Sequence, residues 1–391
     1  METKGLEEGA AGRVTNQLLL ICLFSLFFLS CGKDSTEREC PLILFGEADS
    51  NPGILSIEDS IGIETGDSNY VFGSVGRVEV HPDGSILVLD RIKCTIFQFS
   101  PSGEFMGHIG RKGEGPGEFL QPGFFAVTQN GFVCVSDTEQ GWTYFGPDGE
   151  VLNTYPCSHA RPMQMKAAPF GGILGIRSLL SRGDNCLAAE KSICLWEEES
   201  PDSVITVYLT QNYTFDITDM NRFRSDLIRV DHFPMLFAAG DDFVCIAPSP
   251  RDEPVLLVYD TDGSFRDSLE LPYPLVPRSD EEIAEQKEYM EDFLYTSSQH
   301  THTVDWEPFP DHPLITALGV DARNRIWVQR GFEFHPVFDL FHKAGNHVET
   351  FILPEVNRTD HLSFHLCRYG ILAVPEAPEN FYEVYLIGGN D

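Results

Sequence analysis

The chain has 391 residues, with 60 acidic side chains against 27 basic ones and a formal net charge of −33 at pH 7. This acidic excess disfavours proteins that wrap nucleic acid, or that bind anionic lipid headgroups, through a general positive field. Length alone would predict two or three domains, but the repeats described below favour a single ring of strands.

Residues 1–30 have the composition of an export signal. The apolar run from Leu18 to Leu29 is short for a transmembrane span and suits a secretory signal. It leads into Phe28-Leu29-Ser30-Cys31-Gly32, which resembles a bacterial lipobox with Cys31 as the lipidated residue. We therefore predict a signal peptide over 1–30 and a lipidated tether over 31–50. A plain signal peptide and a membrane anchor remain alternatives.

A pattern of four short apolar runs occurs twice between residues 77 and 149. In the first copy, Pro82-Asp83-Gly84 separates two runs and Asp90 ends the second. In the second copy, Asn130-Gly131 and Asp137 hold the same places. Asp-Gly and Asn-Gly supply the positive φ that a tight hairpin turn needs. Four up-and-down strands, repeated after about 47 residues, predict the blades of a β-propeller.

Weaker copies follow, each with turn residues between its apolar runs, at 161–215, 233–271, 315–353 and 361–387. The last copy lacks one strand unless the segment near Gly53 to Val80 supplies it. Closing the ring in this way removes the open sheet edges that template aggregation. We therefore predict an all-β, six-bladed propeller over 51–391, with five or seven blades as alternatives.

The repeats also resemble a known family. Pro82 to Asp90 reads P-D-G-x-I-x-V-x-D, and Gly113 to Phe119 reads G-x-G-P-G-E-F. Both segments are similar to motifs of the six-bladed β-propeller family of bacterial lipoproteins, which are relatives of the NHL-repeat propellers. The resemblance covers roughly residues 50–391 and is specific for architecture. It implies little about activity, because one fold supports many functions.

One helical segment interrupts the strands, within an insertion over about 273–313. Ser279 and Glu282 fit a capping box, and the apolar residues that follow fall on one helical face. The insertion also carries His300, His302 and His312. Without an H-E-x-x-H motif we interpret them as solvated loop histidines, with a zinc site as the alternative, and assign no metal ligands.

The cysteines fit an exported protein. Cys186 and Cys194 are the best disulfide candidates, eight residues apart across an expected hairpin in an oxidising compartment. Cys94, Cys134 and Cys245 fall at expected core positions of strands, where a free cysteine behaves as a small apolar residue.

Candidate binding residues lie on one face of the predicted ring. This loop face carries the loops between second and third strands and the connections between blades, and function concentrates in such loops. Four arginines hold equivalent positions after second strands: Arg91, Arg177, Arg251 and Arg330. They predict an anion site at the channel mouth, because guanidinium groups suit carboxylates and phosphates, with Asp137 and His335 as further ligand contacts. Alternatively, each arginine pairs with a nearby acid and braces the blades.

Several functions remain open. The first is a monomeric, lipid-anchored binding module of the cell envelope, on its periplasmic face or outer surface, for a peptide, glycan or partner protein and not for nucleic acid. The second is a hydrolase or lyase, by analogy with lactonase-like propellers, with calcium or carboxylates in the channel. Asp137 and Glu118 are the only acids that can be placed there, so binding is favoured and no cofactor is assigned. A structural role in an envelope assembly is a third reading.

Overall fold

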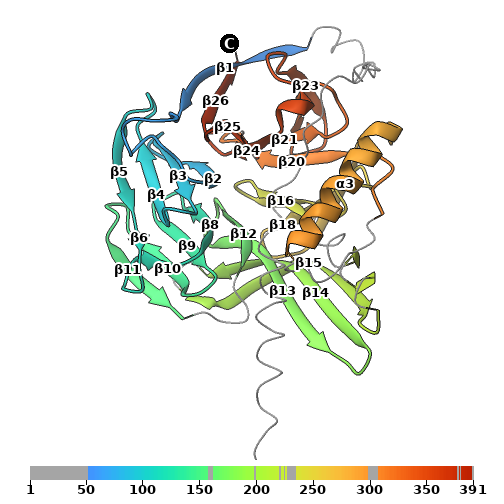
Figure 1. The fold of residues 1–391 in the computed structure, drawn as a ribbon, viewed down its shortest axis with the longest axis horizontal. Coiled ribbons are helices and arrows are strands. Elements are labelled where there is room, and N and C mark those ends of the chain that lie inside the picture. The colour runs from blue at the N-terminus through green and yellow to red at the C-terminus, as the bar shows by residue number, and fades with distance from the viewer. Residues whose placement is uncertain are drawn as a thin grey trace, which may run out of the picture.

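The structure, a computed structural model, is a closed ring of radial β-sheets around a central axis (Figure 1). It describes residues 52–389 except 157–161, 198–199, 220–221, 224, 227–234, 298–306, 377 and 379. The predicted signal peptide, Cys31 and the tether lie outside these residues. The described strands form six blades of four strands each, which confirms the predicted all-β, six-bladed propeller.

In the first three blades, the strands follow one another in chain order from the axis to the rim. Blade 1 contains β2 (Val75–Val80), β3 (Ile86–Asp90), β4 (Thr95–Phe99) and β5 (Phe105–Ile109). Blade 2 contains β8 (Pro122–Val127), β9 (Val133–Asp137), β10 (Gly141–Phe145) and β11 (Val151–Tyr155). Blade 3 contains β12 (Met163–Ala167), β13 (Ile173–Arg182), β14 (Cys186–Glu197) and β15 (Ser200–Asp216).

The last three blades complete the ring. Blade 4 contains β16 (Leu236–Ala239), β17 (Phe243–Ala247), β18 (Val255–Asp260) and β19 (Phe265–Glu270). Blade 5 contains β20 (Ile315–Val320), β21 (Arg325–Arg330), β22 (Val337–His342) and β23 (His347–Ile352). Blade 6 contains β24 (Leu362–Cys367), β25 (Gly370–Pro375), β26 (Val384–Gly389) and the N-terminal β1 (Gly53–Ile61).

The ring closes through β1, as the sequence predicted. This strand pairs antiparallel with β26, from Leu55 opposite Gly389 to Ile61 opposite Val384. Its first residues also pair in parallel with β23 of blade 5. The N-terminal segment thus supplies the missing outer strand of blade 6 and covers the edge of β26.

The hairpin turns adopt the backbone conformations that their residues favour. Gly84 has φ +88° and Gly131 has φ +79°, in the left-handed region that glycine enters without a steric penalty. The Asp83 carboxylate accepts a hydrogen bond from the Ser85 backbone N–H at 2.8 Å. Such a bond mimics a backbone turn and makes the register of β2 and β3 a local property of the sequence.

The apolar core is divided among the interfaces between adjacent blades. Between blades 1 and 2, Leu87 and Leu89 pack with Phe125 and Val135 in one buried cluster. Comparable clusters fill the other five interfaces. Because each blade packs on both of its neighbours, no blade can bury its two faces alone.

Two buried aspartates fix how successive blades are joined. The Asp90 carboxylate accepts hydrogen bonds from the backbone N–H groups of Gly73 and Lys93, at 2.7 and 2.9 Å. Asp137 does the same in blade 2 for Leu120 and Gln140. Each carboxylate therefore holds the connection that enters its blade and the loop after its second strand. The structure gives Asp137, predicted as a ligand contact, this bracing role with 1% of its surface exposed.

The predicted disulfide between Cys186 and Cys194 is wrong. Both residues lie on β14, where eight residues of extended chain separate them by roughly 26 Å, and both are free thiols. The hairpin in this region instead joins Arg182 of β13 to Leu187 of β14. Cys94, Cys134 and Cys245 are buried, as expected for core positions.

The insertion contains α3 (Asp280–Ser297), at the edge of the ring beside blade 5 (Figure 1). The predicted capping box is present, because the Glu282 carboxylate accepts from the Ser279 backbone N–H at 2.8 Å and the Ser279 hydroxyl accepts from the Glu282 N–H at 3.2 Å. Met290 is buried beneath the helix. None of the helices in the described part of the chain is long and apolar enough to cross a membrane.

We expect Asp90→Ala to lower the free energy of unfolding by about 2 to 4 kcal/mol, because several buried backbone N–H groups lose their acceptor. Urea denaturation followed by tryptophan fluorescence measures this change. Asp148→Ala, in an exposed turn, is the matched control and should stay within about 0.5 kcal/mol of the parent. Equal losses in the two variants would contradict the bracing role of Asp90.

Candidate functional site

Arg330, at the end of β21, is buried in an ion-pair cluster within blade 5. Its Nε and Nη2 donate to the two carboxylate oxygens of Asp339 at 2.8 and 2.9 Å, and its Nη1 donates to Glu333 at 3.0 Å. The hydroxyls of Tyr273 and Thr350 donate to the same Asp339 carboxylate. Arg330 is 2% exposed, so the structure contradicts a ligand contact and supports the bracing alternative.

Arg177 and Arg251 are also engaged by neighbouring groups. Arg177 Nη2 donates to the Glu190 carboxylate on β14 at 3.2 Å. The Arg251 guanidinium lies over the Phe309 ring, 3.7 Å from its centroid, and donates to the Asp311 carbonyl. Arg251 thereby fastens the returning part of the insertion to blade 4. These contacts differ from blade to blade, so the predicted ring of four equivalent arginines does not assemble.

Arg91 differs from the other three because it lies against the innermost strand of its blade. Its Nη2 is 3.5 Å from the Gly76 carbonyl of β2. Burial lowers the pKa of the Arg91 guanidinium. His335 lies farther out, with Nδ1 at 2.7 Å from the Val356 carbonyl in the connection between blades 5 and 6. The structure thus places Arg91 near the axis and His335 in a structural contact.

A polar cluster lies where the innermost strands face one another, and we call it the axis cluster: Arg77, Glu79, Lys166, His365 and Cys367. Lys166, on β12 of blade 3, donates from Nζ to the Leu318 carbonyl of β20 in blade 5 at 2.8 Å. It therefore reaches past blade 4 across the axis. Arg77 and Glu79, both on β2, form an ion pair. All five residues are half-buried, so solvent reaches them inside the ring.

The amine of Lys166 is less basic than an ordinary lysine. Burial lowers its pKa to about 8, and the positive charge of Arg77 acts in the same direction. Glu79 has the opposite effect on the pKa, but its carboxylate is already paired with Arg77. At pH 7 the amine is therefore mostly protonated, and within the axis cluster two cations face one carboxylate.

His365 and Cys367 add neutral groups to the axis cluster. Burial lowers the pKa of His365 well below its ordinary value, and the charges of Arg77, Lys166 and Arg91 add to this effect. Burial likewise raises the pKa of the Cys367 thiol well above its ordinary value. The imidazole and the thiol are therefore both uncharged near neutral pH.

The sequence contains a signal for the axis cluster, which lies in strands and not in the loops where the ligand contacts were predicted. Arg77 and Glu79 alternate with valines in R-V-E-V, and His365 and Cys367 alternate with apolar residues in F-H-L-C. In a strand, this spacing places the polar side chains on one side. Polar alternation on the first strand of a blade indicates a side chain that faces the channel.

The insertion is held to the connection between blades 5 and 6 by charged contacts with η2 (Arg358–Asp360). Arg358 Nη2 lies 2.7 Å from the Glu282 carboxylate, and His312 Nε2 lies 3.5 Å from it. Burial acts to raise the pKa of Glu282, but hydrogen bonds from His312 and the Ser279 N–H, together with Arg358, lower it to about 2. His312 is buried, so its prediction as a solvated histidine is wrong.

The other two histidines of the insertion, His300 and His302, lie outside the described residues. Within residues that the structure does describe, no group of three or more His, Cys, Asp or Glu side chains is placed to hold a metal ion.

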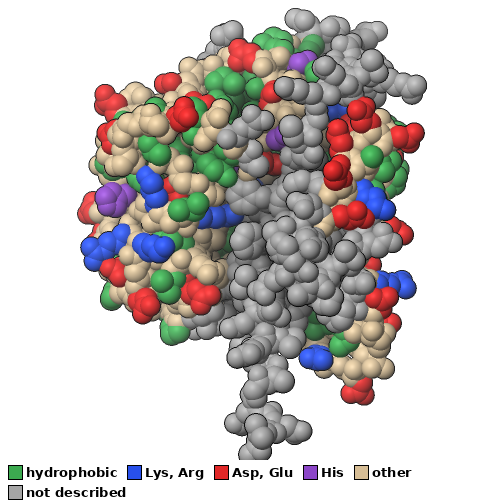
Figure 2. All heavy atoms as spheres, in the orientation of Figure 1, with side chains coloured by type: hydrophobic (Ala, Val, Ile, Leu, Met, Phe, Trp, Pro, Cys, Tyr) green, Lys and Arg blue, Asp and Glu red, His purple; other side chains and the backbone are tan. Residues whose placement is uncertain are grey.

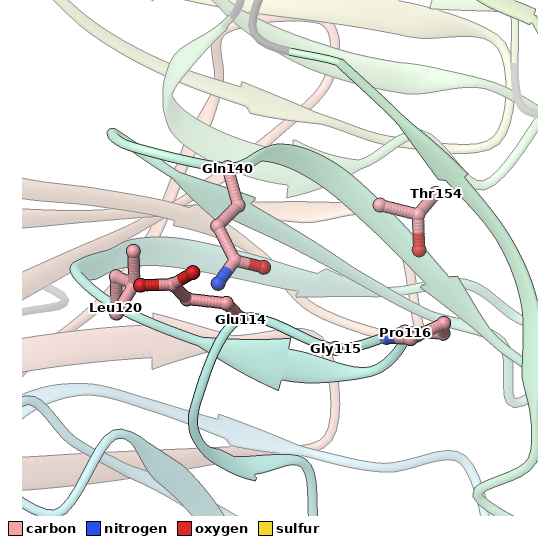
Figure 3. A pocket seen from close by; sticks show the side chains of 6 residues that line it. All are labelled: Glu114, Gly115, Pro116, Leu120, Gln140 and Thr154. Carbon is pink, nitrogen blue, oxygen red and sulfur yellow. The ribbon is translucent and has the colours of Figure 1, made fainter.

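A shallow pocket of about 410 Å³ opens beside the connection between blades 1 and 2 (Figure 3). It is lined by Glu114, Gly115, Pro116, Leu120, Gln140 and Thr154. The connection includes the short parallel pair β6 (Arg111–Lys112) and β7 (Glu118–Phe119). Glu118 accepts from Arg111 Nε at 2.8 Å and from the Gly115 N–H at 2.9 Å, so this acid braces the loop. Glu114, the one charged lining residue, does not favour an anion there.

Comparisons with known proteins agree with this architecture. A family model described as "6-bladed beta-propeller" matches residues 34–144. The solved structure of a Bacteroides fragilis protein, described as a candidate exported protein, has a TM-score of 0.50 and 14% identity, covering 89% of this chain and 98% of its own. The chain is a six-bladed β-propeller.

Two enzymes are more distantly similar to this propeller. A gluconolactonase from Xanthomonas campestris has a TM-score of 0.40 and 10% identity, with 86% of this chain and 98% of its own covered. Virginiamycin B lyase from Staphylococcus aureus has the same score and identity, with 85% and 88% covered. No curated protein matches the propeller in sequence.

We expect Arg330→Met to destabilise the propeller by about 3 to 5 kcal/mol, because it leaves the buried Asp339 and Glu333 carboxylates without their partner. The midpoint of urea unfolding reports the loss. Arg111→Met removes an arginine whose side chain is 78% exposed and serves as the control, with a change below about 1 kcal/mol. A stable Arg330→Met protein that lost only ligand binding would overturn the bracing role.

Proposed function

We propose that this propeller is an exported, lipid-anchored binding module that takes an anionic ligand at its axis cluster. The observation that carries the proposal is the local charge: Arg77 and Lys166 lie near the single carboxylate of Glu79, and Arg91 adds its positive charge near His365. This small positive region occurs in a chain of net charge −33. Charge of one sign, enclosed by low-dielectric walls, concentrates ligands of the opposite sign.

The outer surface near the insertion is acidic, in contrast to the positive axis cluster. Acidic side chains gather over α3 (Figure 2), whose first turn contains Asp280, Glu281 and Glu282. Such a surface repels an anion, whereas the cationic side chains of the axis cluster attract one. The guanidinium of Arg77 suits a carboxylate or phosphate in particular, because its donors lie in one plane at fixed angles.

The anionic class is favoured over a metal ion at the same place. Calcium takes six to eight oxygen ligands, several of them carboxylates. The axis cluster supplies one carboxylate, Glu79, and that group is paired with Arg77. Calcium at the axis therefore enters the experiment below as a competing outcome.

We expect carboxylates and phosphate, tested as citrate, glucuronate and inorganic phosphate at constant ionic strength, to raise the melting temperature of the full-length protein in detergent. An anion that binds the folded state alone stabilises it by about 2.7 kcal/mol at a hundredfold excess over its Kd. Arg77→Gln and Arg91→Gln should each weaken binding about tenfold or more, since a hydrogen bond to a charged group contributes about 1.5 to 3 kcal/mol.

Arg111→Gln is the matched control, because it removes an exposed arginine of the same ring and should retain parental binding. The proposal fails if no anion raises the melting temperature, or if Arg77→Gln and Arg111→Gln respond alike. It also fails if calcium alone stabilises the protein and EDTA reverses the effect, because the axis would then hold a cation.

The envelope location rests on the N-terminal sequence, where an apolar run ends at Cys31. It also agrees with the description of the Bacteroides fragilis propeller as a candidate exported protein. Acyl chains on Cys31 would tether the ring, since each buried methylene contributes about 0.8 kcal/mol to membrane binding.

We expect the wild-type protein, expressed in a bacterium, to partition into the detergent phase of Triton X-114, and Cys31→Ser to lose most of that partition. Cys40→Ser, which changes the next cysteine in the chain, should behave as wild type. Equal partition of wild type and Cys31→Ser would contradict lipidation at Cys31.

A further inference from the structure

The backbone of β12 is distorted where it presents Lys166. Gln164 has φ +53°, in the left-handed region that residues other than glycine rarely adopt. The register between β12 and β13 slips between Met163 and Lys166. Such bulges redirect a side chain and are common next to functional sites. Here the bulge precedes the lysine that reaches across the axis.

Within the part of the chain that the structure describes, no carboxylate is bonded directly to the amine of Lys166. Its Nζ donates to a backbone carbonyl, that of Leu318, whereas the nearby Glu79 carboxylate is bonded to Arg77. Lysines in proteins are normally solvated or ion-paired. This lysine is half-buried near the like charge of Arg77, and desolvation beside another cation is a setting in which an amine becomes a nucleophile near neutral pH.

Arg77 provides a place for a carboxylate beside this amine. It bonds to Glu79 through Nη2, while its Nε is buried and has no hydrogen-bond partner among the described residues. A buried donor without an acceptor costs about 1 to 3 kcal/mol. A ligand oxygen would satisfy this donor. Arg91 lies close enough to His365 to add to the positive potential of the axis cluster.

We propose, building on the anion site of the proposed function, that Lys166 forms a reversible imine with a 2-oxo acid whose carboxylate is held at Arg77. The neutral Nζ adds its lone pair to the ketone carbon, and proton transfer gives a carbinolamine. The hydroxyl group then leaves the carbon as the nitrogen lone pair forms the carbon–nitrogen double bond, and the proton lost from the nitrogen completes the water that is released. No electron donor or acceptor is needed, and water reverses the reaction.

The pH dependence follows from the amine. Only the deprotonated Nζ can attack the ketone carbon, and burial lowers the pKa of Lys166 to about 8. The titratable groups that face it are Arg77, Glu79, His365, Cys367 and Cys245. Imine formation should therefore rise with pH and level off above about 8, whereas an exposed lysine continues to gain reactivity up to its pKa near 10.4.

We expect pyruvate and sodium borohydride, added to the full-length protein in detergent, to give one covalent adduct, since borohydride reduces the imine to a stable secondary amine. Intact mass spectrometry measures the number of adducts, and peptide mapping of the wild-type protein assigns them to Lys166. Lys166→Arg, which retains the positive charge, should lose at least nine-tenths of the labelling. Lys112→Arg, at an exposed position, should not change it.

Acetone, which has the ketone and lacks the carboxylate, distinguishes a held ligand from simple amine reactivity and should label Lys166 at least tenfold less at equal concentration. Arg77→Gln should reduce the pyruvate labelling to the level of acetone. Adducts spread evenly over exposed lysines, or equal labelling of Lys166→Arg, would overturn the imine. If anions still raise the melting temperature in that case, the binding function stands and the imine alone is wrong.

Discussion

The pairing between β1 and β26 turns a curved row of six sheets into a closed ring, and the remaining contacts depend on it. Without it, blade 6 would have three strands and the unpaired edge of β26 would face solvent, where it could template association. The apolar clusters lie between blades and not within them, so a ring that opens at one interface exposes both faces there. Closure therefore stabilises elements that are far from the terminus.

The closed ring also explains why charged residues are tolerated on the innermost strands. Burial of an unpaired ion is costly because water is lost. The axis residues remain half-buried, and the Arg77–Glu79 pair neutralises part of the charge. The amine of Lys166 donates to a backbone carbonyl, that of Leu318, and not to a carboxylate among the described residues. Groups in such settings occur at functional sites and also in structural ion-pair networks.

One position in the blade repeat serves opposite chemistries. At the end of the second strand, blades 1 and 2 carry Asp90 and Asp137, which accept hydrogen bonds from backbone N–H groups. Blade 5 carries Arg330 there, which instead requires Asp339 and Glu333 as acceptors. Both solutions join loops to strands inside a blade. The last residue of the second strand therefore braces the blade in all three cases, although its side chain is an acid in two blades and a base in the third.

The sequence by itself determined the features that depend on neighbouring residues. The hairpin at Asp83-Gly84, the capping box of Ser279 and Glu282 and the count of blades follow from turn conformation, hydrogen bonds a few residues apart and the spacing of apolar runs. The last blade lacked one strand in the sequence pattern, and this gap predicted that the N-terminal segment, β1, closes the ring. Only the tertiary structure decided the rest. Cys186 and Cys194 fall on one strand because a long hairpin turns earlier than expected. Arg77, Lys166 and His365 come from three different blades. They lie near one another because ring closure brings the innermost strands together, and no local pattern in the chain encodes that proximity.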